Sequence, residues 1–101
     1  MIIYRVSGRV YPHKIDEARE RFAELATASR MLPGVVSFDV AQDVTDPAIF
    51  ISTEVYEDQD AVDRQGKLAE LSVLMARLPE LLAGEPHGTI FDASVTGPWP
   101  E

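Results

Sequence analysis

The chain contains no cysteine, so it can form no disulfide, no thiolate metal site and no cysteine nucleophile. It also lacks any apolar run of roughly 18 residues, the length that a membrane-spanning helix requires. The first ten residues, MIIYRVSGRV, show no basic start leading into a long apolar stretch. We therefore expect a soluble cytoplasmic protein that does not enter a membrane.

Basic residues are few, with 9 Lys and Arg against 17 Asp and Glu, which gives a formal net charge of −8. A protein that binds nucleic acid neutralises phosphates with clustered cations. In this sequence the cations stand singly along the chain. We therefore expect no nucleic-acid partner.

The length of 101 residues suits one domain, and an apolar content of 46% is ordinary for a globular protein. The regular hydrophobic pattern stops shortly before the C-terminus, where two prolines flank Trp99. We expect one domain over residues 1–96 and an irregular tail over residues 97–101.

Four segments alternate apolar and polar side chains with a period of two, which is typical of strands. These segments are residues 2–10, 35–42, 48–57 and 89–95. A turn at residues 43–47 joins the second and third as a hairpin, because its Asp, Thr and Pro residues favour turns.

Two other regions show the period of about 3.6 residues that is typical of amphipathic helices. The first begins at Lys14 and ends before Pro33-Gly34. The second begins after Asp58, a suitable N-cap, is interrupted at Gly66, and should end or kink at Pro79. The resulting β-α-β-β-α-β order predicts a ferredoxin-like α+β fold, an antiparallel sheet with helices on one face.

Helices on one face of such a sheet leave the other face bare. The side chains expected there are too apolar to remain in water: Ile3, Val35, Ile49, Ile51 and Val55. A second copy of the sheet is the natural cover, so we expect a twofold homodimer through the sheet face. A monomer with an unusually apolar sheet is the alternative.

Three segments carry a resemblance to a known family: Leu32-Pro33-Gly34-Val35, the hairpin from Phe38 to Asp46-Pro47, and residues 50–58 with the following Ala61. In them the chain resembles the antibiotic biosynthesis monooxygenase domain family, and the similarity extends from Ile2 to about Val95. The resemblance implies a dimeric α/β barrel. It also implies kinship with cofactor-free monooxygenases that oxidise quinols and polyketides.

The resemblance implies a pocket between the sheet and the helices of each subunit. The side chains placed there are Tyr4, Val6, Phe22, Phe38, Phe50, Ser52, Glu54, Tyr56, Gln65, Leu71 and Met75. Gln65 stands where many members have a His, and Tyr56 where many have a Trp. Haem-degrading members use an Asn that aligns with Val6, and this chain contains no Asn. We therefore expect no haem, no other cofactor and no metal.

Oxygenation without a cofactor needs a base, hydrogen-bond donors and a dry cavity. Tyr56 could hold a substrate oxygen, while Glu54 or His87 could take the proton. Each has a structural alternative: a core tyrosine, a carboxylate that pairs with Arg5 or Arg9 or reaches solvent, and a solvated histidine.

The resemblance therefore implies a cofactor-independent monooxygenase that oxidises a small aromatic phenol, quinol or polyketide-like compound with O2. Two alternatives on the same scaffold stay open. One is a non-catalytic or stress-related dimer that binds a small apolar or aromatic molecule, and the other is an isomerase-type enzyme.

Overall fold

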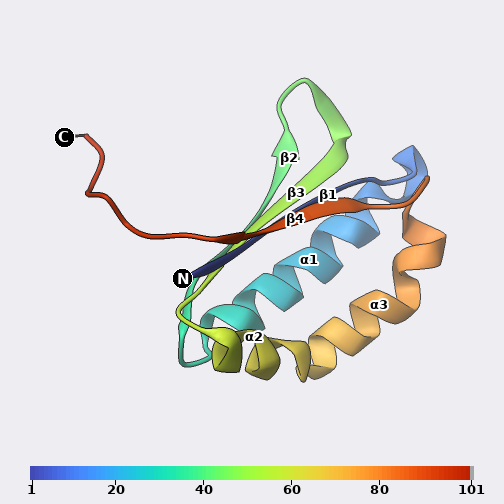
Figure 1. Cartoon of the computed structure of the whole chain (residues 1–101). Helices are drawn as coiled ribbons and strands as arrows, with labels where there is room; N and C mark the ends of the chain where they lie inside the picture. Colours follow the sequence, from blue (N-terminus) through green and yellow to red (C-terminus); the bar gives the residue numbers. More distant parts are fainter. Residues whose placement is uncertain (101) are drawn as a thin grey trace.

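A computed structural model describes residues 1–100 (Figure 1). The elements follow in the order β1 (Ile2–Arg9), the short 3₁₀ turn η1 (Pro12–Lys14), α1 (Ile15–Arg30), β2 (Val35–Asp43), β3 (Asp46–Tyr56), α2 (Gln59–Gly66), α3 (Ala69–Leu81) and β4 (His87–Asp92). The strands form one antiparallel sheet in the order β2-β3-β1-β4. This is the predicted ferredoxin-like α+β fold.

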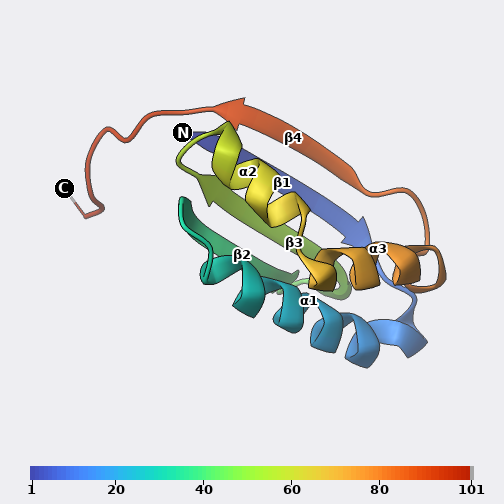
Figure 2. The same cartoon turned by 90° about the horizontal axis from the view of Figure 1, so that it is seen from below.

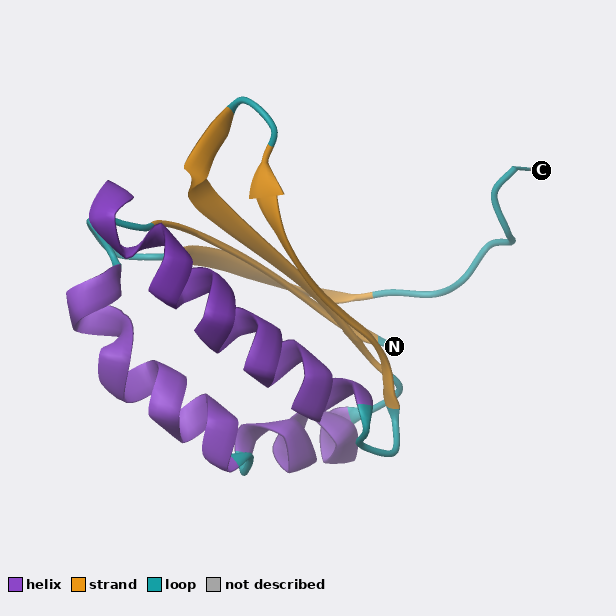
Figure 3. Cartoon of the chain, turned by 180° about the vertical axis from the view of Figure 1, so that it is seen from behind, coloured by secondary structure: helices purple, strands orange, loops and turns teal. Residues whose placement is uncertain are grey.

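The molecule has two layers, a twisted sheet and a layer of helices. Figures 2 and 3 show that α1, α2 and α3 all lie on one side of the sheet, whereas the other side carries no element of this chain. Helix α1 packs against β2 and against α3. Within residues 1–100, no helix is long and apolar enough to span a bilayer.

Helix α1 forms because its apolar positions repeat at the helical spacing predicted from the sequence. Ala18, Leu25, Ala26 and Ser29 are buried on its inner side. Glu17, on the side facing α3, accepts two hydrogen bonds from the Arg77 guanidinium, at 2.8 and 2.9 Å. This bidentate ion pair joins α1 to α3.

Gly34 closes the turn between α1 and β2 and has a φ of 84°, in the left-handed region. A Cβ atom at this position would lie 2.8 Å from the Cβ of Ala61 in α2. Glycine therefore serves both the backbone conformation and the close packing of α2.

The second helical region consists of two helices, α2 and α3, separated after Gly66 as predicted. The side chain of Asp58 caps α2, because its carboxylate accepts the backbone N–H of Ala61 at 3.0 Å, and α2 ends at Gly66. Helix α3, however, continues through Pro79 to Leu81. The helix tolerates proline near its end, and the backbone N–H of Leu82 still bonds the carbonyl of Leu78 at 2.9 Å.

Strand β4 lies earlier in the chain than the sequence predicted. It begins at His87, opposite Ser7, and ends at Asp92 instead of Val95. The pairing of β4 with β1 stops at Asp92 because β1 begins at Ile2. Met1 and Ala93 exchange the last pair of hydrogen bonds, each 2.9 Å long.

The prediction that Val35 lies on the bare face of the sheet was wrong. A bulge between Val35 and Ser37 adds one residue to β2, so that Val35 pairs with Tyr56 and packs against the buried core. Val36 is instead 55% exposed. Ile3, Ile49, Ile51 and Val55 keep the predicted face, and the pairing of Phe91 with Ile3 adds Phe91 to it.

Candidate functional site

A cavity of about 410 Å³ lies between the sheet and the helices. This volume falls in the range of small-molecule pockets. Of the side chains that the sequence placed in the pocket, all but Tyr56 line it: Tyr4, Val6, Phe22, Phe38, Phe50, Ser52, Glu54, Gln65, Leu71 and Met75. Met75 lines the wall and is also 56% exposed, so it stands at the rim.

Strand β3 contributes two polar side chains to the cavity wall, Ser52 and Glu54. Phe50, Ser52 and Glu54 share the face toward the helices, because successive side chains of a strand point to opposite faces. In the pairing register, Glu54 lies between Tyr4 of β1 and Phe38 of β2. A carboxylate is thereby placed among aromatic side chains.

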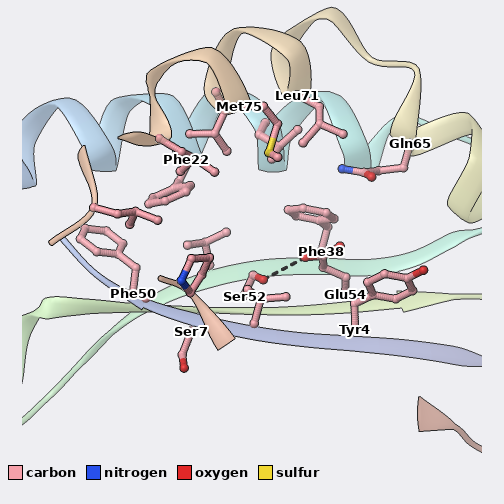
Figure 4. A pocket seen from close by; sticks show the side chains of 18 residues that line it. Tyr4, Ser7, Phe22, Phe38, Phe50, Ser52, Glu54, Gln65, Leu71 and Met75 are labelled. Carbon is pink, nitrogen blue, oxygen red and sulfur yellow. Dashed lines mark hydrogen bonds between the residues drawn. The ribbon is translucent and has the colours of Figure 1, made fainter. Parts of the chain in front are cut away.

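Two neighbouring hydroxyl groups hold the Glu54 carboxylate. The Tyr56 hydroxyl donates to Oε1 at 2.6 Å, and the Ser52 hydroxyl donates to Oε2 at 2.9 Å. Figure 4 shows the Ser52–Glu54 bond at the cavity wall. Since each carboxylate oxygen can accept more than one bond, Glu54 keeps acceptor capacity for a ligand.

Glu54 has no cationic partner among residues 1–100. Arg9, one of the partners considered, pairs with Asp46 at 2.8 Å. Arg5, the other, lies opposite Thr53 on the bare face of the sheet. The carboxylate is therefore held by hydroxyl groups and is not neutralised by a guanidinium.

Tyr56 lies behind the cavity wall and does not line the cavity. It is 1% exposed, and its ring meets the ring of Tyr4 edge to face at a centroid distance of 5.6 Å. Burial and the hydrogen bond to Glu54 raise the pKa of Tyr56, so its hydroxyl stays protonated. This geometry makes Tyr56 a group that orients Glu54, in place of the predicted direct contact with a substrate.

Gln65 reaches the cavity from α2. Its side chain is largely buried and, in Figure 4, points into the cavity from above. The amide nitrogen lies 3.5 Å from the Ser29 hydroxyl oxygen of α1. The helical period of α1 places Ser29 on the buried side of that helix, but nothing in its spacing marks it as a partner of Gln65.

His87 does not reach the cavity, contrary to the role predicted for it. It pairs with Ser7 across β1 and β4, so both side chains lie on the same face of the sheet. Figure 4 shows the Ser7 hydroxyl pointing away from the cavity. His87 is exposed on that opposite face.

Several wall residues were missed as site residues by sequence reasoning. They come from the core faces of the helices and from the chain near β4: Leu25, Leu74, Leu78, Leu82 and Pro86. A helical apolar pattern marks a side chain as inward-facing, but it does not separate the wall of a cavity from solid core. Within the described part of the chain, no three His, Cys, Asp or Glu side chains gather as metal ligands.

Fold and cavity together define a ferredoxin-like α+β protein with an apolar, small-molecule-sized pocket that contains one carboxylate. The model of the antibiotic biosynthesis monooxygenase family matches residues 1–72. The chain belongs to this family, which confirms the resemblance seen in the sequence. No curated protein sequence matches the chain.

Solved structures share the fold at low identity. A protein from Nitrosomonas europaea, described as a proposed antibiotic biosynthesis monooxygenase, aligns with a TM-score of 0.86 and 22% identity over 92% of this chain and 98% of its own. A protein from Deinococcus radiodurans with the same description aligns with a TM-score of 0.86 and 19% identity over 97% of each chain. A Bacteroides thetaiotaomicron protein, described as of unknown function and a possible oxidoreductase, has a TM-score of 0.79 and 22% identity over 89% of this chain and 94% of its own. At these identities the likeness shows the fold.

Proposed function

We propose that the chain is a cofactor-independent monooxygenase that oxidises a small aromatic phenol, quinol or polyketide-like compound with O2. The observation that carries the proposal is the Glu54 carboxylate, held by Ser52 and Tyr56 at the wall of an otherwise apolar cavity. Membership in the antibiotic biosynthesis monooxygenase family supports the same reaction class.

The cavity offers the two conditions that this reaction needs. Its aromatic and aliphatic wall suits a flat substrate and dissolved O2 and keeps water away from the reacting atoms. Glu54 accepts the proton of the substrate hydroxyl, which leaves an electron-rich anion. Ser52 and Tyr56 hold the carboxylate in place during this transfer.

The overall reaction balances without an added reductant. For a quinol, one oxygen atom of O2 forms a new bond to a ring carbon, and the other leaves as water. The products are a hydroxyquinone and one molecule of water. All the electrons that reduce O2 come from the substrate, so the protein supplies only a proton acceptor and a shaped, dry site.

We also propose that the active form is a homodimer through the bare sheet face. That face carries Ile3, Ile49, Ile51, Val55 and Phe91 by the pairing register. An apolar surface of this kind favours burial against a second copy. Exposed Trp99, in the tail beyond β4, lies outside the domain core and is available to such a partner.

Oxygen uptake tests the reaction. Purified protein in metal-free buffer is given a panel of hydroquinones and anthrone-like compounds, and O2 consumption is followed with an electrode. We expect uptake with the wild type and with Glu57→Gln, an exposed acid outside the cavity. Glu54→Gln should lose about 100-fold or more of the rate. Equal rates for the two variants would reject Glu54 as the base.

A second candidate is a non-catalytic binding protein of the same fold. It is favoured by Gln65, whose amide cannot act as a general base, and by the absence of His87 from the cavity. Ligand binding without O2 uptake would support this function. Product formation without O2 consumption would instead point to an isomerase-type enzyme.

A further inference from the structure

Part of the hydrogen-bonding capacity at the cavity wall is already used within the protein. The hydroxyl groups of Ser52 and Tyr56 both donate to the Glu54 carboxylate. The amide nitrogen of Gln65 is directed at Ser29. What remains for a ligand is the carboxylate of Glu54, which accepts, and the part of the Gln65 amide that Ser29 leaves free, its carbonyl oxygen and its second N–H.

Glu54 and Gln65 lie at one end of the cavity, where Tyr4 and Phe38 flank Glu54, and Phe22 and Phe50 lie at the other end. Figure 4 shows Glu54 and Gln65 on the right and Phe22 and Phe50 on the left. The fold agrees, since Glu54 is four residues beyond Phe50 on β3, about 13 Å along the strand. The partner of Gln65, Ser29, likewise lies two turns beyond Phe22 on α1, about 10 Å along the helix.

The end of the cavity that contains Glu54 and Gln65 also carries a negative charge and no positive one. Glu54 is the single Asp or Glu side chain in the described wall, and no Arg, Lys or His lines it. An anionic ligand would face this carboxylate in an apolar setting, without a cation to offset the repulsion. A hydroxyl or amine would instead donate to the free acceptors.

We propose that Glu54 and Gln65 make this cavity selective for uncharged, flat ligands that bear a hydrogen-bond donor at one end, and that Glu54 excludes carboxylates of the same shape. Glu54 is thus a specificity-determining residue as well as the proposed base. The inference rests on the proposed function for its choice of cavity, but it concerns binding alone.

Calorimetry with matched ligands tests this selectivity. Binding of 2-naphthol, 2-methylnaphthalene and 2-naphthoate is measured at pH 7.5 without oxygen, so that no turnover occurs. We expect 2-naphthol to bind at least about 100-fold more tightly than 2-naphthoate, with 2-methylnaphthalene between them. Wild-type protein that binds 2-naphthoate as tightly as 2-naphthol, or binds no 2-naphthol, overturns the proposal.

Two variants separate a local effect from the net charge of −8. Glu54→Gln should bring 2-naphthoate to within about tenfold of 2-naphthol, because the amide can donate to an anion. Glu57→Gln changes net charge equally at an exposed position and should leave the discrimination intact. The same gain of naphthoate binding in both variants contradicts the proposal.

Circular dichroism confirms that the variants are folded. Gln65→Leu gives an independent check, because it should weaken 2-naphthol binding about fivefold or more.

The proposed oxygenase activity and the proposed ligand selectivity fail in different ways. Bound naphthol with no O2 uptake across the substrate panel counts against the oxygenase alone. Unselective binding in a protein that consumes O2 counts against the selectivity alone.

Discussion

The Tyr56 hydroxyl donates a hydrogen bond of 2.6 Å to the carboxylate of Glu54, two residues earlier on the same face of β3. Tyr56 is buried behind the wall, while Glu54 lines the cavity. The tyrosine therefore fixes one carboxylate oxygen from the core side and leaves the remaining acceptor positions toward the cavity. Both residues that hold Glu54, Ser52 and Tyr56, belong to the same strand as Glu54, so no helix takes part in these two hydrogen bonds.

Tyr56→Phe removes this donor and keeps the buried ring. We expect kcat to fall about tenfold or more with little change in KM, because Tyr56 orients the base and does not contact the substrate. The loss of a hydrogen bond to a charged group should also cost about 1–3 kcal/mol of folding free energy. Steady-state kinetics and urea unfolding measure the two effects. Tyr11→Phe, at an exposed tyrosine, is the control, and an unchanged kcat in Tyr56→Phe would contradict the orienting role.

Alkaline titration should reveal the raised pKa of Tyr56. Because the folded state binds the phenolic proton more tightly than the unfolded state, its contribution to stability is complete below the ordinary tyrosine pKa of about 10 and is lost as the pH rises above it. Ultraviolet absorbance at high pH should show one late ionisation that coincides with unfolding. That step should be missing in Tyr56→Phe, and its persistence there would assign it to another tyrosine.

Gly34→Ala should destabilise the fold. The substitution places a Cβ 2.8 Å from Ala61 and forces alanine into a positive φ, at a cost of about 1–3 kcal/mol. Gly66→Ala is the matched control, because no atom lies within 4 Å of its added Cβ and its φ is not positive. Chemical unfolding should show a lower midpoint for the first variant and an equal or higher midpoint for the second. Similar losses in both would argue against the packing described for Gly34.

The ion pair between Glu17 and Arg77 should stabilise the contact of α1 with α3 in a pH-dependent manner. The hydrogen bonds from Arg77 lower the pKa of Glu17, so the contribution is present above the ordinary glutamate pKa of about 4.3 and is lost as the pH falls through the lowered value. Glu17→Gln should therefore lower Tm at pH 7 but have little effect near pH 2. A Tm difference that is equal at both pH values would contradict this.

One charged substitution on the bare sheet face tests the proposed dimer. Ile51→Glu places a carboxylate in the middle of the bare face and should convert the dimer to a monomer in light-scattering measurements. Val44→Glu adds the same charge at a fully exposed turn position and should leave the mass unchanged. A wild-type protein that is monomeric at micromolar concentration would reject the dimer outright.

Much of the candidate site could be predicted from the spacing of side chains within single strands and helices. The period of two in β3 is enough to place Phe50, Ser52 and Glu54 on one face, and the helical period is enough to turn Phe22 and Leu71 toward them. These relations depend on backbone geometry alone. They therefore hold wherever the element itself is correctly predicted.

The errors arose where pairing between strands decides the outcome. Val35 changed faces because a bulge in β2 is set by the fit to β3, which no period in β2 encodes. His87 lies on the bare face because it pairs with Ser7, and its short strand with Gly88 shows no clear alternation. The hydroxyl of Tyr56 contacts Glu54 because the ring is buried in the core beside Tyr4, which is a tertiary property.

Isotope labelling under ¹⁸O₂ shows whether Glu54 in this cavity supports oxygenation by O2 without a cofactor. The protein is incubated with a reactive quinol or anthrone-like substrate under ¹⁸O₂ in metal-free buffer, and the product is analysed by mass spectrometry. We expect one ¹⁸O atom in each product molecule for the wild type and for Glu57→Gln, and little labelled product for Glu54→Gln. Unlabelled product, or the same labelled yield from Glu54→Gln, would contradict this expectation.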